Sequence, residues 1–151
     1  MVYCPDQLVW EIVKNNNSFM KKRNGKTKRS GCVKFSVERG NARSMSYLKY
    51  SGLANEKTTD VIFTEGDGAA LVTKTASKCH TNPSKSFVTT PINKDFRRVD
   101  SIIQKQTMQN YYRPDLKAAV LGKWTKVYQA NRRAKGIKKP VPVKKGRTSS
   151  K

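Results

Sequence analysis

The amino-acid sequence predicts an α+β fold: a small antiparallel sheet with an N-terminal helix and two C-terminal helices, plus an extended basic loop and tail. Two β-rich stretches at 60–64 and 69–75 flank a glycine-containing turn, and apolar residues recur at helical spacing after residue 93. The chain also carries 32 Lys and Arg against 10 Asp and Glu, with 36% hydrophobic residues, below the usual globular share. We therefore expect one domain over 1–131 and a basic tail over 132–151.

The N-terminal segment 5–13 is expected to form a short amphipathic helix. Apolar residues at positions 8, 9, 12 and 13 have the spacing of one helical face, with Asp6 as the expected N-cap and Trp10 in the core. Residues 18–20 are expected to begin a strand. The run of positive charge at 21–31, which contains two glycines, is interpreted as a loop. Alternating Val33, Phe35 and Val37 then predict a further strand.

The C-terminal half is expected to contain two helices and then the tail. From Asn93, the expected N-cap, one apolar stripe follows Phe96, Val99, Ile102, Ile103 and Gln106. Pro114 restarts the helical pattern, in which Leu116, Val120, Trp124 and Val127 recur every three or four residues. The tail has nine Lys or Arg, no acid and two prolines. It should stay disordered until a polyanion neutralises it.

A formal net charge of +22 indicates a polyanionic partner. The sequence has no run of about 18 apolar residues and no signal-peptide features near its start, so we expect a soluble, intracellular protein with no membrane partner. Cys4, Cys32 and Cys79 are odd in number and far apart, which suits free thiols in a reducing compartment.

Catalytic and metal-binding patterns are missing from the sequence. His80 is the only histidine and directly follows Cys79, whereas a nucleophile and its base must face each other across a site. Three separate cysteines and one histidine do not supply paired zinc ligands, and Gly66 and Gly68 lack the strand-then-helix context of a dinucleotide site. We therefore expect no enzymatic activity, no cofactor, no metal and no small-molecule substrate.

Nucleic acid is the partner class that remains, because many Lys and Arg contacts to phosphates release condensed counterions. RNA is favoured over DNA, since no helix-turn-helix, basic zipper or zinc-finger pattern supplies base readout. Tyr47, Tyr50, Tyr111 and Tyr112 are candidates for stacking on unpaired bases, although core packing is equally expected for half of them.

Several ordered blocks of the chain resemble the eukaryote-specific large-subunit ribosomal protein family numbered twenty-eight. The blocks are Leu8-Val9-Trp10 through Ser18-Phe19, Lys22-Arg23-Asn24, Tyr50-Ser51-Gly52-Leu53 with Lys57-Thr58, Ile92-Asn93-Lys94, and Tyr112-Arg113-Pro114-Asp115-Leu116. The resemblance implies a structural constituent of the eukaryotic cytosolic large ribosomal subunit. Its partners would be large-subunit rRNA and neighbouring large-subunit proteins, and it would lie in the cytoplasm after nucleolar passage during assembly.

The residues predicted to bind rRNA combine the basic runs with the family blocks. They are Lys21, Lys22, Arg23, Lys26, Lys28, Arg29, Arg43, Lys49, Tyr50, Lys57, Lys94, Arg113, Lys117, Arg132, Arg133, Lys135, Lys138 and Lys139. For Arg113 two roles remain open, a phosphate clamp at a helix start or a purely local cap, with Asp115 balancing the helix dipole.

Two alternatives belong to other classes. A nucleolar ribosome-assembly factor of related fold resembles the chain around Trp10 and Ser18-Phe19, but that relative carries a cluster of cysteines suited to metal, whereas Cys32 and Cys79 stand alone here. A basic RNA-modifying enzyme would need a nucleotide or substrate pocket, which no motif in the sequence indicates. The ribosomal interpretation is therefore preferred.

Overall fold

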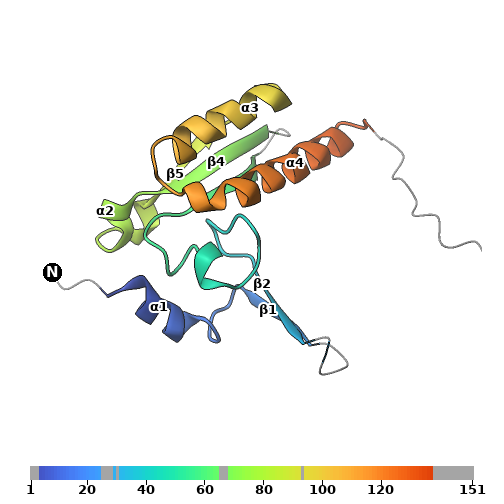
Figure 1. The fold of residues 1–151 in the computed structure, drawn as a ribbon. Coiled ribbons are helices and arrows are strands. Elements are labelled where there is room, and N and C mark those ends of the chain that lie inside the picture. Colours follow the sequence, from blue (N-terminus) through green and yellow to red (C-terminus); the bar gives the residue numbers. More distant parts are fainter. Residues whose placement is uncertain (1–3, 25–28, 30, 65–67, 93, 138–151) are drawn as a thin grey trace, which may run out of the picture.

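The computed structural model describes residues 4–24, 29, 31–64, 68–92 and 94–137 (Figure 1). Its helices and strands are α1 (Asp6–Val13), β1 (Met20–Asn24), β2 (Cys32–Ser36), β3 (Thr59–Thr64), β4 (Gly68–Lys74), α2 (Ala76–Cys79), β5 (Phe87–Pro91), α3 (Phe96–Ile103) and α4 (Lys117–Ala134). Short 3-10 turns at Leu48–Tyr50, Pro83–Lys85 and Pro114–Leu116 connect them. The expected α+β class is confirmed.

Strands β3, β4 and β5 form an antiparallel sheet in that spatial order. Val61 of β3 lies opposite Leu71 of β4, which confirms the hairpin expected from 60–64 and 69–75, although its turn residues 65–67 lie outside the described part of the chain. Strand β5 was not expected from the sequence. Its segment shows little apolar alternation, and hydrogen bonds from β4 complete it as an edge strand.

Helices α3 and α4 lie against one face of this sheet and enclose the core (Figure 1). The sheet contributes Val61 and Leu71, and α3 contributes Val99 and Ile103. The four apolar residues predicted for the last helix, Leu116, Val120, Trp124 and Val127, are all buried. Full burial of one such side chain contributes roughly 1.5 to 3 kcal/mol, so this stripe anchors α4 to the sheet.

The N-terminal helix is present, but the predictions of its N-cap and of its core residue are wrong. Asp6 is the first residue of α1 after Pro5 and makes no cap hydrogen bond; its Oδ2 atom instead accepts the Glu56 N–H at 3.4 Å. Leu8 and Ile12 are exposed, and Trp10 is half-buried outside the core cluster. Helix α1 lies beside the β1–β2 hairpin, away from α3 and α4, so no helical layer covers it (Figure 1).

The basic segment predicted as a loop begins as a strand. Strand β1 includes Lys21, Lys22 and Arg23 and pairs with β2 in antiparallel register, with Lys21 opposite Phe35 and Arg23 opposite Val33. Runs of Lys and Arg carry little local strand signal, and the distant β2 segment supplies the hydrogen bonds. The second strand expected around residues 33–37 is confirmed as β2, and Val37 follows its end.

The ends of the C-terminal helices differ from the expectation. Asp95 rather than Asn93 precedes α3, and Asn93 lies outside the described residues. A π-turn over Gln104–Met108 follows α3; Thr107 is buried there, whereas Gln106, expected on the apolar stripe, is exposed. The wider turn rotates the face that the later residues present.

Helix α4 extends into the segment expected to be tail. The N–H groups of Gly136 and Ile137 bond to the carbonyls of Arg133 and Arg132 at 3.0 and 2.9 Å. Gly136 has φ +79°, the left-handed conformation of a Schellman C-cap, which glycine adopts without strain. Arg132 and Arg133 are therefore helical residues. Gly136 is the signal in the sequence that marks this end.

Candidate nucleic-acid interface

The β1–β2 hairpin exposes the predicted basic run on both of its faces. Lys21 and Arg23 share one face, while Lys22 lies on the other face opposite Lys34. Alternate residues of a strand are about 7 Å apart on a face, so strand pairing holds these cations at regular spacing. All three predicted residues are exposed. Lys26 and Lys28 lie outside the described residues, and Arg29 is exposed.

Apolar side chains accompany the cations on one hairpin face. Val33 and Phe35 are 36% and 42% exposed and lie opposite Arg23 and Lys21, and Phe19 just before β1 is 43% exposed. We call Phe19, Lys21, Arg23, Val33 and Phe35 the mixed hairpin face. Its composition suits contact with a partner surface, because apolar groups that gather in one place on an exposed face mark interaction sites.

Arg113 joins the start of the last helical region to a loop more than fifty residues earlier. Its Nε and Nη2 atoms donate to both carboxylate oxygens of Asp115 at 2.8 Å, and its Nη1 and Nη2 atoms donate to the carbonyls of Lys57 and Lys49 at 2.7 and 2.8 Å. These bonds occupy four of the five guanidinium N–H groups. The geometry therefore favours the local role of Arg113 over a phosphate clamp.

Hydrogen bonds from Arg113 also hold the pKa of Asp115 below its ordinary value of 3.8, against a smaller opposing effect of burial. The carboxylate is therefore fully ionised at neutral pH. Lys49 and Lys57 themselves remain exposed, with their ammonium groups 5.9 Å from the ring centres of Tyr50 and Tyr112. The structure thus brings Lys49, Lys57 and Arg113, predicted separately, to one place.

The four candidate stacking tyrosines divide into two exposed and two inward-facing residues. Tyr47 and Tyr111 are 53% and 86% exposed. Tyr50 packs against the core. The Tyr112 hydroxyl accepts the N–H groups of Thr58 and Lys74 at 3.1 and 3.0 Å and donates to the Lys74 carbonyl. Burial raises the pKa of Tyr112 above 10.0, which keeps this donor protonated. Tyr50, predicted to bind rRNA, therefore has part of its side chain packed against the core.

Gly52 lets the loop that carries Lys49 approach the preceding segment closely. A Cβ atom at this position would lie 1.9 Å from the Arg39 carbonyl oxygen, far inside van der Waals contact. The nearby Lys74 ammonium is buried and donates to the Gly52 and Asn55 carbonyls at 3.0 and 2.8 Å. Glycine and a buried lysine together fix the path of this loop.

The predicted cations at the end of α4 divide in a similar way. Arg132 is half-buried, with its guanidinium carbon 5.9 Å from the centre of the Tyr128 ring, whereas Arg133 and Lys135 are exposed. Positive charge in the last helical turn also matches the negative end of the helix dipole. Lys138 and Lys139 lie outside the described residues. Lys94, just before α3, and Lys117, the first residue of α4, are exposed and distant from the hairpin in sequence.

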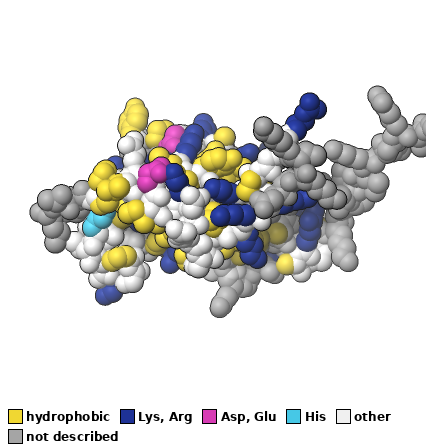
Figure 2. Space-filling view, turned by 90° about the horizontal axis from the view of Figure 1, so that it is seen from below, with side chains coloured by type: hydrophobic (Ala, Val, Ile, Leu, Met, Phe, Trp, Pro, Cys, Tyr) yellow, Lys and Arg dark blue, Asp and Glu magenta, His cyan; other side chains and the backbone are white. Residues whose placement is uncertain are grey.

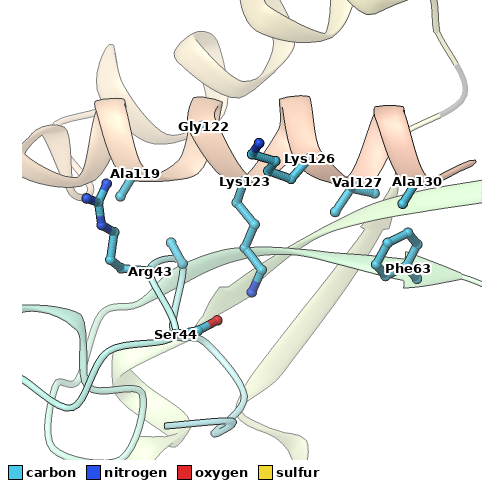
Figure 3. Close-up of a pocket in the computed structure, with 10 residues that line it drawn as sticks. Arg43, Ser44, Phe63, Ala119, Gly122, Lys123, Lys126, Val127 and Ala130 are labelled. Atoms are coloured by element: carbon cyan, nitrogen blue, oxygen red, sulfur yellow. The ribbon is translucent and has the colours of Figure 1, made fainter. Parts of the chain in front are cut away.

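Arg43 lies at a groove of about 570 Å³ between α4 and β3 (Figure 3). The groove is lined by Ala42, Arg43, Ser44, Phe63, Ala119, Gly122, Lys123, Lys126, Val127 and Ala130. Lys123 extends across it to the buried Asp60, with Nζ 2.5 Å from Oδ1, and also donates to the Asn41 carbonyl at 3.1 Å. Lys126 and Phe63 were not predicted from the sequence. Gly122, a glycine inside a helical pattern, is the one sequence signal that marks this part of the last helix as unusual.

Cationic side chains exceed anionic ones on the described surface. Figure 2 shows Lys and Arg spread over the face seen from below, with few Asp or Glu among them. Ion pairs within the described residues involve only four Lys or Arg, namely Lys14 with Glu11, Arg98 with Asp95, Arg113 with Asp115 and Lys123 with Asp60. Most cations of this surface are therefore free to meet an external anion.

Features of other functional classes are weak. In the described ranges, no group of three or more His, Cys, Asp or Glu side chains is placed to hold a metal ion. His80 contacts Glu56, with Nε2 3.1 Å from Oε1. No helix of the described chain has the length and apolarity needed to cross a membrane.

The fold and this surface define a small, strongly basic α+β protein with cations displayed on a hairpin, a loop and a helix end. Comparison with known sequences identifies the family. The chain belongs to the ribosomal L28e protein family, whose model matches residues 8–130. It is 37% identical over 131 residues to the large ribosomal subunit protein eL28 of Dictyostelium discoideum, covering 85% of this chain and 89% of that protein.

Two further relatives bear the same name. Large ribosomal subunit protein eL28 of Schizosaccharomyces pombe is 27% identical over 133 residues, covering 87% of this chain and 96% of the relative. The Caenorhabditis elegans protein is 34% identical over 89 residues, covering 59% and 64% of the two chains. The resemblance expected from the sequence blocks is thus confirmed.

Proposed function

We propose that this protein is a structural constituent of the eukaryotic cytosolic large ribosomal subunit, where Lys and Arg side chains bind rRNA phosphates and stabilise the RNA. The observation that carries the proposal is family membership over residues 8–130, together with three relatives named as large-subunit proteins. The net charge of +22 supports it, because a polyanion neutralises such a surface most directly.

The proposed rRNA contacts differ in kind. Lys21, Lys22 and Arg23 on the hairpin are the main candidates for phosphate binding, because their exposed side chains have no described ion-pair partner. Arg113 instead organises the loop that presents Lys49 and Lys57, with four of its own donors already used. Phosphate contacts position a protein on RNA without reading its sequence, which is what an architectural role requires.

Neighbouring large-subunit proteins are the second class of proposed partner. The apolar residues of the mixed hairpin face lie at the surface instead of in the core. A two-stranded ribbon is only marginally stable alone, and burial of these residues against a neighbour would add stability. No catalytic step is proposed. We place the mature protein in the cytoplasm, after passage through the nucleolus during subunit assembly.

Sedimentation of tagged protein from cell extract, followed by a high-salt wash of the pooled subunits, tests the proposal. We expect the protein to co-migrate with the large subunit and to resist the wash. Migration only with nuclear precursor particles would instead support the alternative, a nucleolar assembly factor. Protein that remains free at the top of the gradient would contradict both assignments.

A further inference from the structure

We infer that the groove between α4 and β3 binds an unpaired nucleotide of the RNA, with its base on Phe63 and its flanking phosphates on Arg43 and Lys126. This inference rests on the proposed function and assigns one specific site within it. The groove has a volume of about 570 Å³, within the range of small-molecule sites, and Figure 3 shows these side chains around it.

Gly122 opens the groove on the helix side. It lies in the middle of α4, where glycine weakens a helix more than any residue except proline. A Cβ atom at Gly122 would meet no other atom within 4 Å, so no internal packing requires the glycine. Ala119 and Ala130 continue the same open surface. The missing side chains leave room for a group from outside the protein.

Charge defines the chemistry of that group. The ten lining residues include three cations and no Asp or Glu. Lys123 is already bound to Asp60 and Asn41, whereas Arg43 and Lys126 are exposed and form no ion pair within the described residues. Two free cations beside one cavity favour an occupant with closely spaced negative charges, as in a nucleic-acid strand.

The aromatic ring of Phe63 indicates that the occupant carries a base and is not a simple anion. Phe63 is 57% exposed although it lies in β3, and it lies at the opposite end of the groove from Arg43 (Figure 3). Exposed aromatic rings beside cationic side chains hold single-stranded nucleic acid by base stacking and phosphate contact together. Duplex RNA offers only paired, stacked bases, so this groove selects an unpaired nucleotide.

The test compares two RNAs on the full-length protein: a mixed-sequence single-stranded oligoribonucleotide and a duplex with the same number of phosphates. Gly122→Gln fills the groove, and Phe63→Leu removes the aromatic face. Ala118→Gln is the matched control, since Ala118 is exposed on the same helix but does not line the groove. Glutamine is a better helix former than glycine, so Gly122→Gln should not impair folding, and thermal unfolding checks this.

We expect Gly122→Gln and Phe63→Leu to weaken single-strand binding roughly five- to a hundredfold, with duplex binding and the Ala118→Gln control unchanged. Unchanged single-strand affinity, or equal loss for both RNAs, would overturn the inference. Normal RNA affinity combined with lost subunit incorporation of Gly122→Gln would show that a protein segment occupies the groove, which also overturns it. If the wild-type protein bound neither RNA, the proposed function itself would fail.

Discussion

The Lys123 ammonium lies 2.5 Å from the Oδ1 atom of Asp60, and 3% of the Asp60 side chain is exposed. This pair connects the middle of α4 to the first residues of β3, 63 positions away in sequence. The same Asp60 oxygen accepts the Val61 N–H at 2.7 Å. The aspartate therefore holds the helix, the strand and the wall of the groove in one arrangement.

Lys123→Met should destabilise the domain, because it leaves Asp60 buried without a counter-charge. Breaking a buried pair costs roughly 3 to 5 kcal/mol, and we expect the lower end since 25% of the Lys123 side chain is exposed. Lys126→Met, three residues further on an exposed surface, should change stability by less than about 0.5 kcal/mol. Chemical denaturation of both variants measures the difference. Equal stabilities would contradict a structural role for the pair.

Asp60 also predicts a specific pH dependence. Burial raises its pKa above the ordinary value of 3.8, while the charge and hydrogen bond of Lys123 partly oppose the shift. The folded state therefore binds the proton more tightly than the unfolded state, so the contribution of Asp60 to stability falls as pH rises from about 3.8 through the folded pKa.

Asp60→Asn removes this titration. The unfolding free energy of the variant minus that of the wild type should increase as pH rises through the same window, whatever the constant offset between them. Urea unfolding at several pH values between roughly 3 and 7 measures it. Parallel curves for the two proteins would show that the pKa of Asp60 is not raised.

Tyr112→Phe should lower stability by about 1 to 3 kcal/mol, because the Thr58 N–H loses its acceptor and the Lys74 N–H keeps only its bond to the Thr58 carbonyl. The neighbouring Tyr111 provides a matched control, since its side chain is 86% exposed. Tyr111→Phe should be nearly neutral in the same thermal unfolding experiment. A similar effect of both substitutions would mean that the Tyr112 hydroxyl contributes nothing beyond the ring.

Two glycine-to-alanine substitutions should act in opposite directions. Gly52→Ala places a methyl group against the Arg39 backbone and should destabilise the fold strongly, since the backbone itself must move. Gly122→Ala meets no atom and should stabilise α4 by about 0.5 to 1 kcal/mol. Melting temperatures of the two variants give the sign of each effect. A tolerated Gly52→Ala would argue against the close approach of this loop to Arg39.

Replacing Lys21, Lys22 and Arg23 together by Gln should weaken RNA binding and reduce its salt dependence. Each duplex phosphate contact contributes about 0.9 to the slope of log K against log salt, so three lost contacts reduce the slope by about 2.7. Replacing Arg97, Arg98 and Lys105 by Gln removes the same charge from exposed positions on and after α3. This control should change the slope less. Equal changes would indicate a diffuse charge effect.

The main architecture was predictable from sequence where signals are local. The hairpin at 60–64 and 69–75 and the buried stripe of α4 depend on alternation and helical periodicity, which neighbouring residues display in full. The basic run at 21–23 was placed in a loop because its own residues favour no strand. Only the pairing with β2, a strand further along the chain, makes this segment a strand.

The residue types of the candidate site could be predicted from the sequence, but most contacts between those residues could not. Lys21 and Lys49, predicted from the sequence to bind rRNA, are exposed, since positive charge resists burial wherever it has no partner. Arg113 was also predicted to bind rRNA, but the sequence left two roles open for it, a phosphate clamp or a local cap. Its contacts to the Lys49 and Lys57 carbonyls are 64 and 56 residues distant, and no local pattern encodes them.

By itself, the sequence determined the α+β class, the apolar face of the last helix, the excess of positive charge and the family. These properties reside in residue type and short-range spacing, which folding does not change. The tertiary structure alone decided which cations are free and which are occupied, that Lys123 belongs to Asp60, and that Gly122 and Phe63 border one groove. Such relationships arise from contacts between distant segments, which exist only once the core has brought those segments together.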